Sequence, residues 1–356
     1  MSYRSIIAAL AAGIMLAGCG QESTPTQSNV GPSMATDASH NILGHNSPGP
    51  NLYVANDPSG GPYSITVYAK GTSRLLRKIS DNVNEPTRLA FDISGNLYVA
   101  SYPNNTVTVF GSGTDKVLET IRTGIDGPGR PAFDSAGNMY VPNYNSSTVA
   151  VYAPGNATPS RTISQNIYGP SVVALDSSDN LYVANAQEEE FGVAVFAAGT
   201  GNPVQTITNG VDTPVYLSFD EKGNLWVANG GPHPYDDSVT EYGSGNYSLL
   251  NTLNKGIFEP RRLAFDGSQH LVVLNRRTIT AFKPGANAPY LTIHKGAPVS
   301  ADIVVGSDGS VYVATGQQNG KRQGKGVVNV YAPGQVNISR RIKSGIDEPT
   351  TLEFGP

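Results

Sequence analysis

The sequence predicts an all-β fold, a seven-bladed β-propeller with four strands in each blade. The main observation is a hexapeptide, Asn-Leu-Tyr-Val-Ala-Ser at residues 96–101, that recurs in variant form at residues 51, 138, 180, 224, 270 and 310. Successive copies therefore begin 40 to 46 residues apart, a period typical of propeller blades. The 356-residue chain also contains 40 Gly and 25 Pro and only 15% charged residues, a composition that favours short strands joined by turns.

The first 19 residues have the pattern of a bacterial export signal. Arg4 precedes an apolar run over residues 6–16, which is too short for a membrane span and suits the core of a signal peptide. The run leads into Leu16-Ala17-Gly18-Cys19, which resembles the lipobox of bacterial lipoproteins. The resemblance implies a lipoprotein signal peptide over residues 1–18 and lipidation of Cys19. Because Cys19 is the only cysteine, an intramolecular disulfide is excluded.

Residues 19–50 are predicted to be the acylated cysteine followed by a flexible tether. They are rich in Ser, Thr, Gln, Asn, Gly and Pro without apolar periodicity, and a coil of this length spans about 30 Å on average. Acyl chains on Cys19 would hold the protein on a membrane surface. In a Gram-negative host, Gly20 rather than Asp after the cysteine implies the outer membrane, facing the periplasm or the cell surface. The net charge of −4 and the lack of a long basic run argue against a nucleic-acid partner.

Residues 51–356 contain the repeats, and residues 86–121 show their predicted strands. The alternating and β-branched segments 86–92, 96–101, 107–110 and 117–121 are predicted to be the four strands of one blade. Between the first two lies an Asp-containing turn that recurs at Asp92, Asp134, Asp176, Asp220 and Asp266. Asp at such a position bonds to its own backbone, so we expect turns here rather than metal sites.

The ends of the array predict how the ring closes. Residues 51–56 lack a first strand before them, and residues 349–354 form a first strand with nothing after it. We expect these two segments to complete one shared blade, which would leave few exposed strand edges.

Three motifs within residues 51–356 carry a family resemblance. The patterns Pro-x-x-Leu-Ala-Phe-Asp, Gly-Asn-Leu-Tyr-Val-Ala-Asn and Val-Thr-Val-Tyr-Ala-Pro-Gly resemble bacterial variants of the NHL repeat. The resemblance implies a β-propeller. NHL-like propellers include protein-binding platforms, sugar lactonases and lyases, so it leaves the class of function open.

One face of the predicted ring differs in its loops from blade to blade. The loops between second and third strands range from residues 276–277 alone to residues 316–326, so recognition is expected on this face, with neutral drift as the alternative. The first strands converge on the channel and would place polar side chains at its mouth on this side. These candidates are Arg88, Arg130, Tyr216, Arg262, Asp302 and, two positions further along its strand, Glu353, with His233 as a candidate loop contact.

The arginines of this set have two interpretations. Guanidinium groups could form an anion-binding mouth that accepts a carboxylate or phosphate. They could instead pair with acidic residues of the loops between fourth and first strands, and this is the interpretation that the sequence favours. Those acidic residues are Glu85, Asp126, Asp212, Glu259 and Asp347.

The sequence favours a binding function over catalysis. The five histidines are scattered, and nucleophile and phosphate-loop motifs are absent, so we predict no cofactor, no metal site and no assignable catalytic residue. We expect a non-catalytic binding or scaffold module in the cell envelope, whose partner is an envelope protein, a glycan or a small anionic ligand. The alternative is a lactonase-like, metal-dependent hydrolase or lyase. In that case calcium would bind at the channel mouth through Glu353, Asp302 and asparagines such as Asn143 and Asn229.

Overall fold

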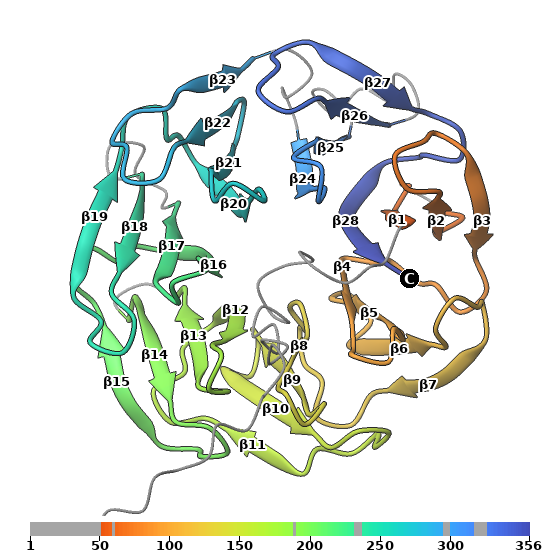
Figure 1. Cartoon of the computed structure of the whole chain (residues 1–356). Coiled ribbons are helices and arrows are strands. Elements are labelled where there is room, and N and C mark those ends of the chain that lie inside the picture. The colour runs from red at the N-terminus through yellow and green to blue at the C-terminus, as the bar shows by residue number, and fades with distance from the viewer. Residues whose placement is uncertain (1–50, 59–60, 188–189, 231–236, 295–299, 317–325) are drawn as a thin grey trace, which may run out of the picture. The chain divides into compact units, whose positions relative to one another are not determined.

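The fold is a closed ring of seven blades (Figure 1). The structure is a computed structural model that describes residues 51–58, 61–187, 190–230, 237–294, 300–316 and 326–356. The described residues form seven four-stranded antiparallel sheets around a central channel, which confirms the predicted all-β propeller. Within these ranges no helix is long and apolar enough to cross a membrane.

Six blades are built from four consecutive strands each, with the first strand at the channel and the fourth at the rim. The first three of these blades comprise β4 (Arg88–Phe91), β5 (Leu97–Ser101), β6 (Thr106–Phe110) and β7 (Val117–Ile121); β8 (Ala132–Phe133), β9 (Met139–Asn143), β10 (Thr148–Tyr152) and β11 (Arg161–Ile163); and β12 (Pro170–Leu175), β13 (Leu181–Asn185), β14 (Gly192–Phe196) and β15 (Pro203–Ile207). The other three comprise β16 (Pro214–Phe219), β17 (Leu225–Asn229), β18 (Ser238–Tyr242) and β19 (Leu249–Leu253); β20 (Pro260–Phe265), β21 (Leu271–Asn275), β22 (Ile279–Phe282) and β23 (Leu291–Ile293); and β24 (Ser300–Val305), β25 (Val311–Thr315), β26 (Val327–Tyr331) and β27 (Ile338–Ile342).

The seventh blade closes the ring with strands from both ends of the array. Its order is β28 (Pro349–Gly355), β1 (Asn51–Asn56), β2 (Ser64–Tyr68) and β3 (Leu75–Ile79). β28 pairs antiparallel with β1, so that Leu52 lies opposite Phe354 and Val54 lies opposite Leu352. The predicted closure of the ring is therefore confirmed.

Blade β8–β11 departs from the predicted pattern because its first strand is short. Pro131 immediately precedes β8, and Pro142 lies in the paired strand β9. Neither residue has an N–H group to donate, so the ladder between the two strands is interrupted. The chain still follows β9, since the Gly129 N–H donates to the Pro142 carbonyl at 2.8 Å. Arg130 consequently lies just before a strand rather than within one.

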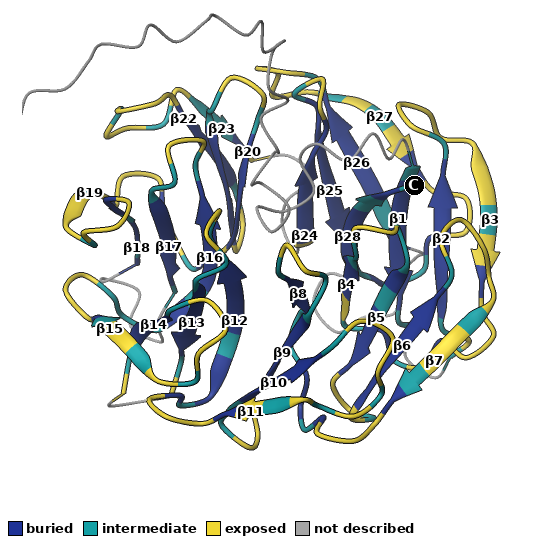
Figure 2. Ribbon diagram, turned by 60° about the horizontal axis from the view of Figure 1, so that its bottom comes forward, coloured by how far each residue is buried: buried dark blue, intermediate teal, exposed yellow. Residues whose placement is uncertain are grey.

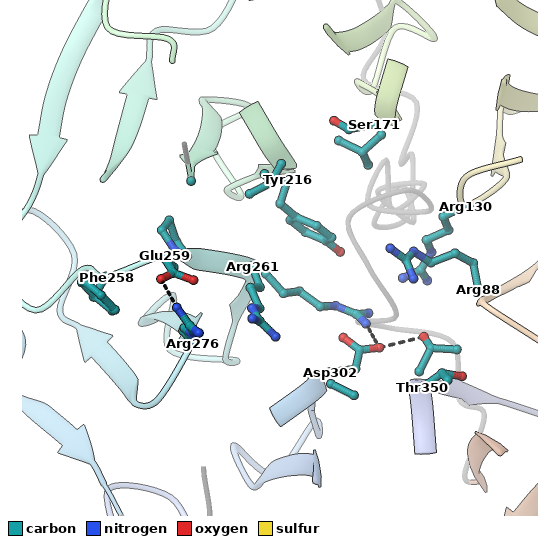
Figure 3. A pocket seen from close by; sticks show the side chains of 17 residues that line it. Arg88, Arg130, Ser171, Tyr216, Phe258, Glu259, Arg261, Arg276, Asp302 and Thr350 are labelled. Carbon is teal, nitrogen blue, oxygen red and sulfur yellow. Dashed lines mark hydrogen bonds and ion pairs between the residues drawn. The ribbon is translucent and has the colours of Figure 1, made fainter. Parts of the chain in front are cut away.

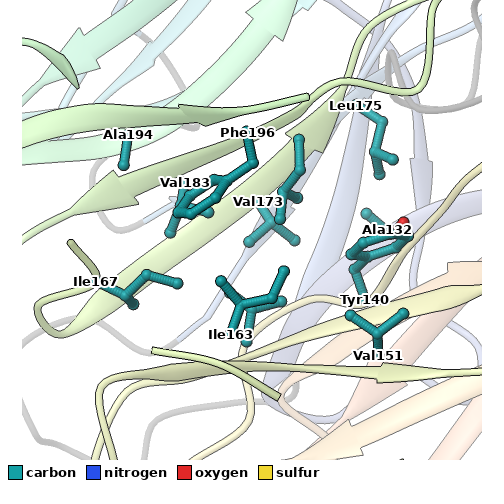
Figure 4. Close-up of a cluster of buried hydrophobic side chains, with 12 residues drawn as sticks. Ala132, Tyr140, Val151, Ile163, Ile167, Val173, Leu175, Val183, Ala194 and Phe196 are labelled. Atoms are coloured by element: carbon teal, nitrogen blue, oxygen red, sulfur yellow. The ribbon is translucent and has the colours of Figure 1, made fainter. Parts of the chain in front are cut away.

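The core consists of apolar layers between neighbouring blades (Figure 4). In one layer, Val151 and Ile163 of blade β8–β11 pack with Val173, Val183 and Phe196 of blade β12–β15. Burial of each such side chain contributes about 1.5–3 kcal/mol. The outermost strands β3, β7, β15 and β19 consist of exposed and partly exposed residues and end in a buried one, as Figure 2 shows at the rim. The layers hold the inner strands rigidly around the channel.

The turns between first and second strands are held by hydrogen bonds within each repeat. Asp134 Oδ1 accepts from the backbone N–H groups of Ala136 and Asn138, at 3.0 and 2.8 Å. Its Oδ2 accepts from Asn138 Nδ2 at 2.8 Å and from the Tyr140 hydroxyl at 3.1 Å. Gly137 completes the turn with a φ of +82°, a value that favours glycine. The predicted turn role of these aspartates is therefore confirmed.

Candidate functional site

The candidate site is a cavity at the mouth of the channel. Its volume is about 880 Å³, within the range of small-molecule sites. The walls come from the beginnings of the first strands and from adjoining loop residues such as Gly230, Phe258 and Arg276. The mouth therefore opens on the face of the strand 2–3 and strand 4–1 loops, where recognition was expected.

Bulges in the first strands bring two successive residues of a blade into the cavity wall. The pairing with the second strand shifts register at the start of β12, β16, β20, β24 and β28. A bulge leaves one residue unpaired and redirects its side chain. The pairs that line the cavity in this way are Ser171 and Val172, Val215 and Tyr216, Arg261 and Arg262, Ala301 and Asp302, and Thr350 and Thr351.

The structure brings most of the predicted site residues together. Arg88, Arg130, Tyr216, Arg262 and Asp302 all line the cavity, and Figure 3 shows several of them converging on its centre.

Glu353 does not line the cavity. Glu353 is 3% exposed and forms ion pairs with Arg130 and with Arg262. Cys19 and His233 lie outside the described residues, so their predictions stay untested.

Asp302 joins three blades through its carboxylate. Oδ2 accepts hydrogen bonds from the Arg262 guanidinium of β20, from the Thr351 hydroxyl of β28 at 2.7 Å and from the Leu352 N–H at 2.9 Å. Oδ1 accepts from the Ile303 N–H at 2.9 Å. Asp302 is only 5% exposed. A buried carboxylate with this many donors acts as a cross-link between blades.

Arg262 is the cation at the centre of the network. It is 6% exposed, and its guanidinium bonds to Asp302 and lies 3.7 Å from Glu353 Oε2. The guanidinium also lies 5.7 Å from the centre of the Tyr216 ring, within cation–π range. Desolvation lowers the pKa of Arg262, but the charges of Asp302, Tyr216 and Glu353 outweigh it, so the net pKa is raised. Arg262 therefore remains charged and is paired with carboxylates through its terminal nitrogens, while its buried Nε has no hydrogen-bond partner among the described residues.

The prediction that the channel arginines pair with acidic residues of the loops between fourth and first strands was wrong. Among the described residues, Arg130 and Arg262 pair with Glu353 and Asp302. None of the five acidic loop residues proposed from the sequence bonds to Arg88, Arg130 or Arg262 in the described chain. Glu259 instead pairs with Arg276 at the entrance of the cavity, at 2.5 Å. The arginines pair with Asp302 and Glu353 because their side chains reach into the channel, where these two carboxylates are also buried.

Two guanidinium groups of the cavity lack a carboxylate partner within the described chain, those of Arg88 and Arg261. Both side chains are exposed in the cavity. Arg88 Nη1 donates to the neighbouring Thr87 carbonyl at 2.8 Å, and Figure 3 shows its side chain beside Arg130. Desolvation by the channel walls lowers the pKa of Arg88; Asp302 raises it, while the like charges of Arg262 and Arg130 lower it further. The group nevertheless stays charged at neutral pH.

The cavity wall has an excess of positive charge. Five arginines line it against two carboxylates, Glu259 and Asp302. Glu353 lies behind the wall and is paired with Arg130. The Tyr216 hydroxyl, directed into the cavity in Figure 3, has no hydrogen-bond partner among the described residues. The wall therefore offers exposed guanidinium groups to a ligand, which is chemistry suited to an anion.

The asparagines that could have served as metal ligands have structural roles. Asn143 Oδ1 accepts from the Asp126 N–H at 3.0 Å, and its Nδ2 donates to the Gly124 carbonyl at 2.8 Å. Asn229 makes the same pair of bonds with Asp212 and Gly210. These amides tie the second strands to the preceding loops. Over the described ranges, no cluster of three or more His, Cys, Asp or Glu side chains has a metal-binding arrangement.

The site also contains residues that the sequence analysis missed. Arg261, Ser171, Val215 and Thr350 enter the cavity because of the bulges, whereas strict period-two alternation directs them away from it. A usable signal was the proline that begins four of the bulged strands, since proline in a sheet is largely restricted to strand starts, edges and bulges.

No protein-family model and no curated protein matches this sequence. The resemblance to NHL repeats therefore depends on the repeat motifs alone.

Proposed function

We propose that the protein is a lipid-anchored binding protein of the cell envelope, and that its propeller binds an anionic group at the channel mouth. The observation that carries the binding proposal is the exposed guanidinium of Arg88, which lies beside Arg130 and has no carboxylate partner among the described residues. Like charges in this arrangement repel one another. A bound carboxylate or phosphate removes that repulsion and accepts charge-assisted hydrogen bonds.

The state of the carboxylates favours binding over catalysis. In the lactonase-like alternative, Asp302 and Glu353 would supply metal ligands or a general base. Asp302 already accepts four hydrogen bonds, and the oxygen of Glu353 nearest the channel arginines accepts from Arg130. A metal ion would have to displace these guanidinium groups and leave them buried without partners, which is costly.

The membrane anchor in this proposal is supported by the sequence of residues 1–19. The charged start, the apolar run and Leu16-Ala17-Gly18-Cys19 are the features of a lipoprotein signal. NHL-type identity of the propeller is likewise proposed from its repeat motifs. Mass spectrometry of the mature N-terminal peptide tests the anchor: an acylated Cys19 is expected, and an unmodified peptide retaining residues 1–18 contradicts it.

The binding proposal is tested by calorimetric titration of the full chain in detergent at low salt. The probes are inorganic phosphate and a monocarboxylate such as acetate. Substitution Arg88→Ala is expected to weaken binding of a bound probe about tenfold, while Arg88→Lys weakens it less because the charge is kept.

The control is Arg122→Ala, since Arg122 is exposed and lies outside the cavity wall. This variant should bind as the wild type does. Thermal unfolding should also be unchanged for Arg88→Ala, because an exposed side chain without an ion pair contributes within about 0.5 kcal/mol. Equal affinity of the wild type and Arg88→Ala for every probe contradicts the proposed site.

A further inference from the structure

We infer that the ligand carries two anionic groups, one held by Arg88 and the other by Arg261 on the opposite side of the mouth. This inference rests on the proposed function, because it specifies which anion the same cavity selects. The observation behind it is the pair of exposed guanidinium groups without a carboxylate partner among the described residues.

Arg261 owes its position to a bulge. Pro260 pairs with Asn275 and Arg262 pairs with Leu274, which leaves Arg261 outside the ladder. Its side chain is exposed and lines the cavity, while its neighbour Arg262 turns into the buried network. The residues at the equivalent position of the other blades are uncharged: Thr87, Gly129, Ser171, Val215, Ala301 and Thr350. The charge at this position is thus specific to blade β20–β23.

The two guanidinium groups lie across the channel from each other. β20 contacts β24, which contacts β28, which contacts β4, so two blades separate the strands that carry Arg261 and Arg88. Figure 1 shows β4 and β20 on opposite sides of the channel, and in Figure 3 Asp302 lies between the two arginines. The charge of Arg262 between them is offset by Asp302 and Glu353. The mouth therefore presents two separated positive groups around a neutralised centre.

The charged groups of the wall outside these two are already paired with one another or with Glu353. The hydroxyls of Ser171 and Thr350 already donate to the Pro214 and Pro86 carbonyls, at 2.8 and 2.7 Å. Further lining residues on this part of the wall are Val172, Val215 and Pro260. This combination suits a molecule whose two anionic groups are joined by a mainly apolar spacer, such as an α,ω-dicarboxylate.

The test compares carboxylates of equal length with one and with two charges. Aliphatic α,ω-dicarboxylates of increasing chain length, and the monocarboxylates of the same lengths, are titrated into the full chain in detergent at low salt. At one length the dicarboxylate is expected to bind about tenfold more tightly than its monocarboxylate. Arg261→Ala should remove that advantage by weakening the dicarboxylate more than the monocarboxylate, whereas Arg88→Ala should weaken both. Arg122→Ala serves as the matched control.

Other results separate this inference from the proposed function. If dicarboxylates bind no more tightly than monocarboxylates at every length, or if Arg261→Ala keeps the full advantage, the two-charge inference is wrong. The anion site itself still stands if Arg88→Ala weakens the monocarboxylate. If Arg88→Ala changes neither series, the proposed function fails together with the inference. Unaltered thermal unfolding of both variants shows that the loss is not one of folding.

Discussion

The two faces of the ring satisfy their polar groups in different ways. On the turn face, where first and second strands connect, Asp134 bonds with Asn138 and Tyr140 of its own repeat, and Asp176 does the same with Asn180 and Tyr182. On the mouth face the main bonds run between blades, from Arg262 to Asp302 and from Arg130 to Glu353. The bonds of these aspartates are thus encoded within each repeat, although Ser135 on the same face also bonds to Asp179 of the next blade, whereas the ion pairs of the mouth require the assembled ring.

The largest expected effect of this difference is on stability at the mouth. Asp302→Ala removes the partner of buried Arg262 and leaves the Thr351 hydroxyl and the Leu352 N–H without their acceptor. Breaking a buried pair from one side costs about 3–5 kcal/mol, so the thermal midpoint should fall by several degrees. Denaturant unfolding monitored by circular dichroism measures the loss.

The matched control for Asp302 is the ion pair of Glu259 and Arg276 at the entrance of the cavity. Its side chains are 30% and 49% exposed. Solvent screens such a pair, so Glu259→Ala should cost about 0–1 kcal/mol. Equal losses for Asp302→Ala and Glu259→Ala would show that the inter-blade network does not stabilise the ring.

A smaller effect is expected at the turn face. Asp134→Ala leaves the Ala136 and Asn138 N–H groups and the Tyr140 hydroxyl without their acceptor. Part of this loss is recovered from water, so the cost is about 1–3 kcal/mol. Ligand affinity at the mouth should not change. Asp81→Ala, at an exposed aspartate, should stay within about 0.5 kcal/mol, and a loss of ligand affinity in Asp134→Ala would refute the independence of the faces.

The last expected effect is a pH dependence that appears only in the alkaline range. Desolvation, followed by the charge of Asp134 and its hydrogen bond, raises the pKa of Tyr140 to about 12. Desolvation alone raises the pKa of Tyr152 to about 12. The unfolded chain ionises these phenols near pH 10 and therefore binds fewer protons than the folded chain between about pH 10 and 12. Their contribution to stability is complete below about pH 10 and is lost as the pH rises toward 12.

Thermal unfolding midpoints across this range, together with tyrosinate absorbance of the folded chain, test the prediction. In Asp134→Ala the pKa of Tyr140 should fall, because the charge of the Asp134 carboxylate is gone. It should stay above the pKa of an exposed tyrosine, because the desolvation of the Tyr140 hydroxyl remains. An unchanged midpoint from pH 9 to about pH 12 contradicts the raised pKa values.

The same difference explains what could be predicted from the sequence. The blades, the ring closure and the role of Asp134 depend on short-range patterns that recur in each repeat. The channel positions of Arg88 and Arg262 could also be predicted from the sequence, because period-two alternation in aligned first strands directs equivalent residues to one place.

The rest depended on contacts between distant residues. Arg130 and Glu353 are separated by 223 positions, and Arg262 and Asp302 by 40, so their pairing could not be read from local patterns. The bulge at Arg261 and the shortened β8 arise from local breaks in the ladder, which strand periodicity does not encode.

The pairing of β1 with β28 also determines on which face of the ring β1 begins. Asn51 lies opposite Gly355, at the far end of β28 from Thr350 and Thr351, which line the cavity. The segment before residue 51 therefore joins the ring on the turn face, away from the mouth. A substituent attached to the chain ahead of β1 would therefore enter the blade at the end opposite the anion-binding cavity.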